Sequence, residues 1–311
     1  MTVSLDWAYR GFQVAVLENE HLKATLVPEI GGKLHELIYK PLDRDVLFHH
    51  PRVELRQAVF GVNVDDWWTG GVDDVLPTGH ACKVNGEELP YLGELWSLPW
   101  QLEREGVHAI RLTREGVITP FRMERRVELL PGESSLRLDY TLTNVGTQPF
   151  PFIWGLHPGF PIGPKTRFEI DGARVVFADG DRPEEFGDAD EGSWPLASVT
   201  RLGAEPTNTW SLLHVTDLQD GRLSITDDEW GVVVSIRFPH ELFRCVWVWL
   251  VDGGWRGIRC VALEPWTGYP ARLDQAIAQG RALRLAPGEA IEAAFAIEVS
   301  ENTNDERGAE S

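Results

Sequence analysis

Short runs of β-type sequence, separated by turn residues, recur along this chain and limit the folds that it can adopt. In residues 136–143, apolar and polar side chains alternate strictly, and an Asn-Val-Gly turn follows. Alternation with a period of two is typical of a strand that buries one face. We predict further strands, joined by turns, at residues 12–17, 22–27, 37–39, 123–130, 223–226, 231–238, 243–250, 258–263 and 290–299.

Helical patterns are scarce, and only residues 273–279 have modest helical character. Thirty glycines and twenty prolines favour many turns. No linker, repeat or low-complexity segment divides the 311 residues, and all-β folds reach this length as one unit. We therefore predict an all-β, mostly antiparallel sandwich that forms a single domain from residues 1–311, with residues 301–311 as a disordered polar tail.

The charge and the absence of targeting signals restrict the partners and the compartment. The formal net charge is −19, whereas nucleic acids and anionic membranes bind basic surfaces. The first residues lack a basic segment followed by an apolar one, and no window approaches the ~18 apolar residues of a membrane span. We expect a soluble cytoplasmic protein that binds neither nucleic acid nor membrane.

The cysteines give no sign of a metal centre or a disulfide framework. The chain has three, Cys82, Cys245 and Cys260, which cannot all pair and match no metal-ligand spacing. The acidic segment near residue 70 also lacks the spacing of a calcium-binding loop. We expect no metal and no cofactor.

The segment 63–78 is the first that is dense in chemically useful side chains, and we expect it to form one glycine-rich loop. Carboxylates accept hydrogen bonds from hydroxyl groups, and an indole face packs against the C–H face of a sugar ring. Such a mixture suits a polyol site, and the alternative is a solvated acidic loop anchored by tryptophan. The residues concerned are Asp65, Asp66, Trp67, Trp68, Asp73 and Asp74.

His157 is the first candidate for catalysis. It lies among apolar residues, between a strand-like run and a turn rich in proline and glycine. A buried histidine needs a polar partner, and because histidine titrates near neutral pH it can act as a general acid or base. The alternative is a core histidine whose ring bonds to a backbone carbonyl.

Glu264 is the second candidate, because an apolar run leads directly into it and Pro265 and Trp266 follow. An unpaired buried carboxylate is costly, so we expect a partner or a chemical role. It lies 107 positions after His157 (264 − 157), so only the fold can bring the two together. Upstream, Trp247 and Trp249 share one face of a predicted strand, where they either stack on a sugar or pack between sheets.

Four segments of the chain resemble motifs of the aldose 1-epimerase (galactose mutarotase-like) family. They are residues 70–78, 90–96, 154–158 and 263–268, in the order found in the family, with Gly31-Gly32-Lys33 ahead of them. The likeness spans roughly residues 28–300, and the ordered set is more specific than any single motif. It implies a β-supersandwich with a sugar site on its concave face, His157 as the general acid and Glu264 as the general base.

Together with the aromatic and acidic segments, the resemblance predicts a set of substrate contacts. The residues are Lys33, Trp68, Asp73, Asp74, Tyr91, Trp249 and Trp266.

The chemistry of such an enzyme fits the two residue types. To interconvert the anomers of a hexose or related sugar, a base removes the proton of the C1 hydroxyl while an acid protonates the ring oxygen. The ring opens, turns about C1–C2 and closes again, without metal or nucleotide. A nearby carboxylate favours protonated histidine, so we expect a bell-shaped pH–rate profile. The expected partner is a small sugar, bound by a monomer or a homodimer.

One position departs from the family pattern. Relatives carry Asp-His-Gly-Glu where this chain has Tyr91-Leu92-Gly93-Glu94. Leucine cannot hydrogen-bond, so sugar recognition is either altered here or supplied by neighbours such as His80 and Tyr91.

Three alternatives remain open at the level of sequence. A carbohydrate-binding protein without catalysis would use the same cleft, and Leu92 favours it. A sugar-phosphate epimerase needs cationic groups, and Lys33, Arg256 and Arg259 lie near the motifs. A glycosidase would use two carboxylates such as Asp74 and Glu264, which leaves His157 without a role.

Overall fold

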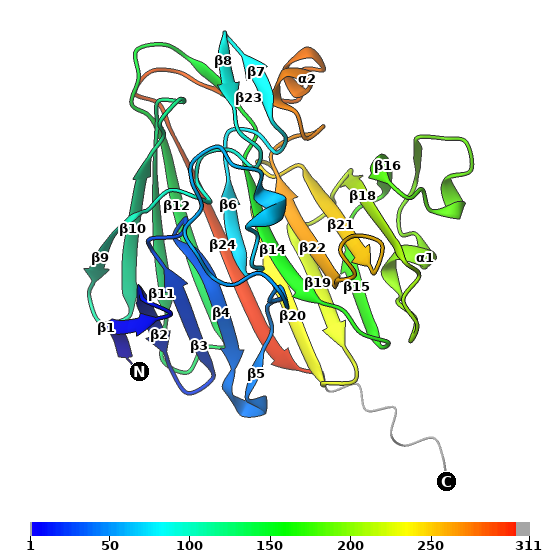
Figure 1. Ribbon diagram of the computed structural model, residues 1–311, viewed down its shortest axis with the longest axis horizontal. Helices are drawn as coiled ribbons and strands as arrows, with labels where there is room; N and C mark the ends of the chain where they lie inside the picture. The colour runs from blue at the N-terminus through cyan, green and yellow to red at the C-terminus, as the bar shows by residue number, and fades with distance from the viewer. Residues whose placement is uncertain (1, 303–311) are drawn as a thin grey trace.

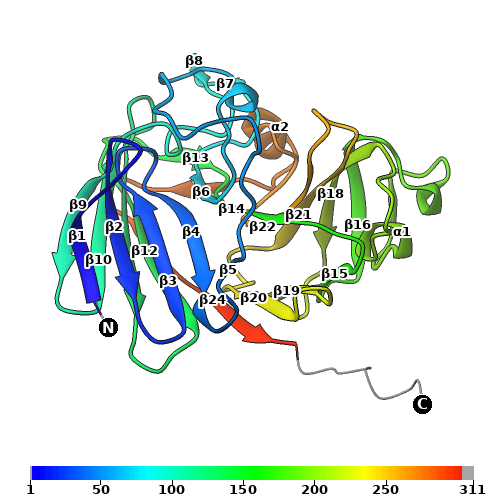
Figure 2. The ribbon, with the colours of Figure 1, turned by 60° about the horizontal axis from the view of Figure 1, so that its bottom comes forward.

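A computed structural model describes residues 2–302, and its strands form two large stacked sheets (Figures 1 and 2). Within these residues, the larger sheet has twelve strands, and its neighbouring strands run antiparallel. In spatial order they are β1 (Thr2–Tyr9), β2 (Phe12–Glu18), β3 (Leu22–Val27), β4 (Lys33–Tyr39), β6 (Val72–Val75), β14 (Gly155–Pro161), β22 (Arg259–Trp266), β21 (Cys245–Asp252), β18 (Thr209–Thr216), β16 (Arg174–Gly180) and β17 (Glu191–Ser193), with β5 (Arg44–Asp45) paired to β4.

The smaller sheet has eight strands in the described part of the chain. In spatial order they are β15 (Thr166–Ile170), β19 (Arg222–Asp227), β20 (Val232–Arg237), β24 (Ala290–Glu301), β12 (Ser135–Asn144), β11 (Phe121–Leu129), β10 (Ala109–Glu115) and β9 (Gln101–Glu105). Two strand pairs complete the set, β7 (Cys82–Val84) with β8 (Glu87–Leu89) and β13 (Phe150–Phe152) with β23 (Leu283–Leu285).

Helices are short. They are α1 (Ala197–Thr200), α2 (Leu273–Ala278) and the 3₁₀ turns η1 (Lys40–Leu42), η2 (Val64–Asp66) and η3 (Glu184–Phe186). No helix within residues 2–302 is long and apolar enough to cross a bilayer. In Figure 1, α2 and the β7–β8 hairpin lie together at one end of the sheets, above β6, β14 and β22.

Most predicted strands are confirmed, and three segments differ from expectation. Residues 63–78 are not one loop, because they contain η2 and β6. The stretch around His157 is not a turn, because Gly155, Pro158, Gly159 and Pro161 lie within β14. Glu264 does not end its strand, since β22 continues to Trp266. Of the predicted tail, Glu301 is the last residue of β24, and residues 303–311 lie outside the described part.

The central strands of the larger sheet, β6, β14, β22 and β21, are buried on both faces, which explains their apolar runs. One face packs on the smaller sheet in the main hydrophobic cluster, to which β14 contributes Leu156 and Phe160. The other face carries a second cluster that includes Trp68, Trp247 and Trp266. Because side chains alternate along a strand, β21 and β22 send alternate residues to the second cluster, among them Cys245, Trp247, Cys260 and Trp266. This second face holds the candidate site.

A buried ion pair joins the two sheets. Arg125 points inward from β11, and its Nη1 lies 2.6 Å from Oδ2 of Asp74 on β6. The guanidinium also donates to the backbone carbonyl of Gly32 and lies 5.0 Å from the ring centroid of Trp100. A buried charge pair of this kind is costly to break, because either group left alone would be an uncompensated charge.

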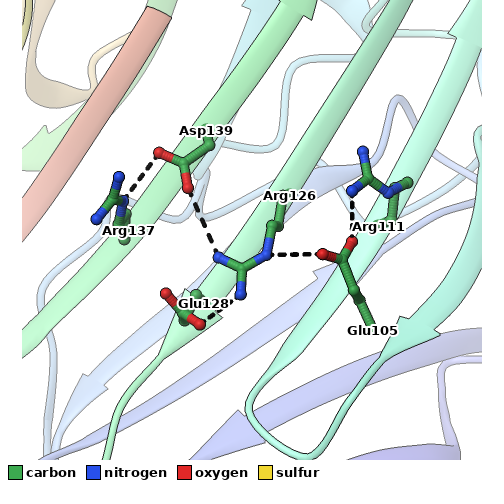
Figure 3. Close-up of polar contacts among 6 residues, drawn as sticks. All are labelled: Glu105, Arg111, Arg126, Glu128, Arg137 and Asp139. Atoms are coloured by element: carbon green, nitrogen blue, oxygen red, sulfur yellow. Dashed lines mark hydrogen bonds and ion pairs between the residues drawn. The ribbon is translucent and has the colours of Figure 1, made fainter.

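The outer face of the smaller sheet carries a network of ion pairs (Figure 3). Its centre is Arg126, which contacts carboxylates on β9, β11 and β12. The members are Glu105, Arg111, Arg126, Glu128, Arg137 and Asp139.

Candidate active site

A cavity opens on the second face of the larger sheet, between the strands and the connections that cover them. It contains about 520 Å³ of space free of protein atoms, including the part open to solvent. Its polar lining consists of Asp65, His80, Tyr91, His157 and Glu264. Its apolar walls include Trp68, Leu92, Leu212, Trp247, Trp249 and Trp255.

Strand register places His157 directly beside Glu264. On the adjacent antiparallel strands β14 and β22, Gly155 pairs with Trp266 and Gly159 pairs with Ala262. His157 is two residues after Gly155, and Glu264 is two residues before Trp266. The two side chains are therefore cross-strand neighbours on one face, although they are far apart in the sequence.

The same register extends into a row of polar and aromatic side chains across the sheet. On one side His157 pairs with Asp73 of β6, whose neighbour on β4 is Lys33. On the other side Glu264 pairs with Trp247 of β21, which pairs with His214 of β18. We call this set the cross-sheet row: Lys33, Asp73, His157, Glu264, Trp247 and His214.

The two central side chains face each other without a hydrogen bond between them. Nε2 of His157 lies 3.6 Å from Oε1 of Glu264, and both residues are buried, with exposed fractions of 6% and 2%. The other oxygen of Glu264, Oε2, accepts a hydrogen bond from Nε1 of Trp266 at 2.9 Å. That bond fixes the carboxylate, so that Oε1 is directed toward the imidazole.

Two glycines of β14 make room for the indoles around His157. A Cβ atom at Gly155 would overlap the ring of Trp266, and one at Gly159 would lie 2.9 Å from the ring of Trp68. Glycine in a strand often marks such a close approach. The glycines that looked like a turn in the sequence therefore serve to pack two tryptophans against the strand.

The aromatic walls contact one another and the histidine. Trp247 stacks on Trp266 with ring centroids 3.8 Å apart and planes 11° apart. Trp68 makes edge contacts with Trp249 at 5.4 Å and with His157 at 5.5 Å. Trp255 makes an edge contact with Trp249, with ring centroids 5.3 Å apart. The cavity is thus lined by both indole rings and polar side chains.

Glu264 has different partners from the other buried carboxylates of residues 2–302. Asp73, Asp74 and Asp252 each pair with a lysine or arginine, and Glu94 accepts hydrogen bonds from three backbone N–H groups. Glu264 has an indole N–H and an imidazole instead. Burial raises its pKa, and the charge of His157 and the hydrogen bond from Trp266 oppose that rise.

The remaining polar groups of the cavity are also perturbed by burial. Burial raises the pKa values of Asp65 and Tyr91 and lowers the pKa of His80. Each shift favours the neutral form, as expected where water is partly excluded. Perturbed groups gathered in one cavity are typical of a functional site.

The structure brings five of the nine predicted site residues into the cavity: His157, Glu264, Trp68, Tyr91 and Trp249. The other four, Lys33, Asp73, Asp74 and Trp266, do not line it.

Each of these four has a structural partner instead. Nζ of Lys33 contacts Oδ2 of Asp73 at 2.5 Å and donates to the carbonyl of Gly70 at 2.7 Å. Asp74 lies on the opposite face of β6, where it pairs with Arg125 between the sheets. Trp266 donates its indole N–H to Oε2 of Glu264 and stacks on Trp247.

The predicted set of substrate contacts did not include the cavity residues Asp65, Leu212, Trp247 and Trp255, although Asp65 belongs to the predicted polyol segment. Trp247 shares a face with Trp249, so the predicted strand already contained that signal. Leu212 lies on β18, a strand that was not predicted. Trp255 follows two glycines in the β21–β22 connection, and a lone tryptophan in such a turn was the available signal.

Position 92, where the family pattern has histidine, does line the cavity. Leu92 has a left-handed backbone with φ of 54°, and its N–H donates to the carbonyl of Gly79 at 2.7 Å. His80 and Tyr91, the two suggested substitutes, line the cavity as well, with ring centroids 4.9 Å apart. Hydrogen-bonding groups are therefore present beside the leucine.

No protein-family model matches the chain. Several solved structures match it over nearly their whole length. One is a galactose mutarotase-like protein from Clostridium acetobutylicum, with 13% identity, a TM-score of 0.69, and 96% of this chain and 98% of that chain covered. Another is a galactose mutarotase-like protein from Lactobacillus casei, with 15% identity, a TM-score of 0.65, and 92% and 100% covered.

A third match is a candidate aldose 1-epimerase from Escherichia coli K12, with 18% identity, a TM-score of 0.69, and 94% and 100% covered. At these identities the likeness shows the fold. The predicted all-β, mostly antiparallel sandwich of the galactose mutarotase-like type is confirmed.

Proposed function

We propose that this chain, which has the fold of the galactose mutarotase-like proteins, is an isomerase that interconverts the α and β anomers of a hexose or related sugar. The observation that supports it most directly is the contact between His157 and Glu264. An imidazole and a carboxylate lie 3.6 Å apart at the base of an indole-walled cavity. One side chain can give a proton and the other can take one.

The proposed reaction uses these two groups in both directions. Glu264 removes the proton of the C1 hydroxyl while His157 protonates the ring oxygen, so that the C1–O bond of the ring breaks and C1 becomes an aldehyde. The open sugar turns about C1–C2. When the ring oxygen attacks the other face of C1, it returns its proton to His157, and Glu264 returns its proton to the new hydroxyl.

The short separation suits this reaction better than it suits glycoside hydrolysis. The two oxygens that exchange protons are attached to the same carbon, so the acid and the base must be neighbours. Glycosidases place two carboxyl groups about 5 to 9.5 Å apart on either side of the bond they cleave. The second carboxylate considered for that alternative, Asp74, lies between the sheets in its ion pair with Arg125.

The lining of the cavity favours a neutral sugar. None of the described residues that line it is a lysine or arginine, and its basic groups are the imidazoles of His80 and His157. Lys33, considered for a phosphate group, is paired with Asp73, and Arg256 is bound to Asp66 at 2.8 Å. A phosphorylated substrate therefore has less support.

The test is anomeric exchange in the His157→Ala and Glu264→Gln variants, followed by polarimetry or NMR saturation exchange over a panel of aldoses. We expect each variant to lose about 10²- to 10⁴-fold in kcat/KM, the usual contribution of a positioned acid or base. Variants that equilibrate every active sugar as fast as the wild type would contradict the mechanism. Saturable binding with no exchange for any sugar would support a carbohydrate-binding protein instead.

A further inference from the structure

A second cavity adjoins the candidate active site. Asp65, His80 and Tyr91 line both cavities, so the two share a wall. The outer cavity has about 1300 Å³ of space free of protein atoms, including the part open to solvent, compared with about 520 Å³ for the inner one. The inner cavity contains the acid and the base, but most of the open space lies outside it.

The lining of the outer cavity combines aromatic, aliphatic and hydrogen-bonding side chains. Phe60 and Tyr91 are half-buried rings, and Ile118 is a half-buried aliphatic wall. Asn63 and Glu88 are exposed and can bond to hydroxyl groups, and Oε1 of Glu88 also pairs with Nζ of Lys83 at 3.2 Å on the surface. None of the described residues that line it is a lysine or arginine. This chemistry fits a neutral, polyhydroxylated ligand better than an anionic one.

The walls of the outer cavity are held by contacts that do not depend on a ligand. The buried carboxylate of Glu94 accepts hydrogen bonds from the N–H groups of Val117 and Ile118, both at 2.7 Å. These bonds fix the β10–β11 turn that carries Ile118. On another side, Oδ1 of Asn63 accepts from the N–H of Asp65 at 3.1 Å, which fixes the start of η2. The space is therefore formed before any ligand binds, which lowers the cost of binding.

We propose that the outer cavity binds a second neutral sugar unit, linked to the unit in the inner cavity through a hydroxyl other than the one at C1. The proposal rests on the proposed function, because the C1 hydroxyl must be free for anomeric exchange. The preferred substrate is then the reducing end of a disaccharide or longer oligosaccharide. Phe60 provides a ring for the second unit, and Glu88 accepts its hydroxyl hydrogen bonds.

The experiment compares reducing disaccharides of different linkage with their parent monosaccharides. For each sugar, kcat/KM for anomeric exchange is measured by NMR with the wild type and with Phe60→Ala and Glu88→Gln. The matched controls are Val59→Ala and Glu87→Gln, which change exposed neighbours that do not line the cavity. Monosaccharides that carry an alkyl ether on a hydroxyl other than the one at C1 test whether the outer cavity binds an apolar group instead.

We expect at least one linkage for which the wild type favours the disaccharide about tenfold, and we expect Phe60→Ala to remove that preference while the controls keep it. Equal kcat/KM for disaccharides and monosaccharides in the wild type would overturn the proposal. So would a preference that Phe60→Ala and Glu88→Gln leave intact. A preference for the alkyl ethers alone would overturn the proposal, because it would show that the outer cavity binds an apolar group and not a sugar.

If the proposed function is wrong, the outcome can be distinguished from failure of the outer-cavity proposal. If the wild type exchanges none of the sugars, the same panel is measured by titration calorimetry. Tighter binding of a disaccharide that is lost in Phe60→Ala would still support the outer cavity as a sugar site, and equal binding of all sugars would overturn it.

Discussion

At the scale of single residues, the partner of each buried carboxylate distinguishes the groups that stabilise the fold from the one that lines the cavity. Asp73 and Asp74 are adjacent in the sequence, but strand geometry sends them to opposite faces of β6. Each meets a cation there, Lys33 or Arg125. Glu264 meets no such cation, so its carboxylate keeps the capacity to take a proton.

The environment of Glu264, the base of the proposed reaction, should therefore reduce the stability of the fold. Burial raises its pKa above the ordinary value of 4.5, so the folded state disfavours the ionised form. Between the ordinary and the raised pKa the folded protein holds more protons than the unfolded chain, and the free energy of unfolding falls as pH rises through that window. We predict that Glu264→Gln is more stable than the wild type at neutral pH.

Urea unfolding at several pH values checks this prediction. The difference between Glu264→Gln and the wild type should shrink on acidification, because the protonated carboxyl resembles the amide. A difference that stays constant down to pH 4, or a variant less stable than the wild type at neutral pH, would contradict it. Glu103→Gln, at an exposed position on β9, is the control.

At the scale of elements, the sequence predicted strands better than it predicted what glycine and proline do within them. The alternation in residues 136–143 gave β12 within one residue at each end, because burial on one face leaves a regular pattern. The glycines of β14 indicated a turn, yet they accommodate the rings of Trp266 and Trp68, which come from distant parts of the chain. Sequence spacing carries no information on such contacts.

Glu94 has a structural role that the sequence did not predict. It belongs to one of the four motifs, but it does not line the candidate active site. Its carboxylate binds the N–H groups of Val117, Ile118 and Thr119. In Glu94→Gln, the amide NH₂ would face backbone donors and leave at least one unpaired. We predict a loss of about 2 kcal/mol in the free energy of unfolding, measured by urea denaturation. A loss no larger than that of Glu103→Gln would contradict this role.

The carboxylate of Asp74 also stabilises the fold, through its ion pair with Arg125 between the two sheets. We predict that Asp74→Ala lowers the free energy of unfolding by about 3 to 5 kcal/mol, because the guanidinium is left buried and unpaired. The double variant Asp74→Leu/Arg125→Met should recover most of that loss. If the double variant is as unstable as Asp74→Ala, the cost lies in packing and not in the unpaired charge.

At the scale of the whole molecule, charge is distributed differently over the faces of the sandwich. The core between the sheets holds the pair of Arg125 and Asp74, and the second face of the larger sheet holds the cross-sheet row. The outer face of the smaller sheet carries the network around Arg126 (Figure 3), which is partly open to solvent. Partly exposed pairs contribute less than buried ones and are screened by salt.

The network around Arg126 should therefore contribute only modestly to the free energy of unfolding. The hydrogen bond from Arg126 lowers the pKa of Glu128, so its stabilisation is present above the ordinary pKa and is lost as pH falls through the lowered one. We predict that Arg126→Gln costs about 1 kcal/mol in low salt at neutral pH and less in about 1 M NaCl. Urea unfolding at both salt concentrations measures it. An unchanged cost in high salt would contradict screening.

The cross-sheet row has a consequence for how activity and folding are related. Its six residues come from β4, β6, β14, β22, β21 and β18, and they span 231 positions (264 − 33) from Lys33 to Glu264. The proposed acid and base and their flanking groups are far apart in the sequence. Only the pairing of strands over long sequence distances brings them together. A partly folded intermediate that lacks any central strand would be inactive. Catalysis by this chain would then serve as an assay for completion of the sheet, and it should disappear no later than the structure does in a denaturation experiment.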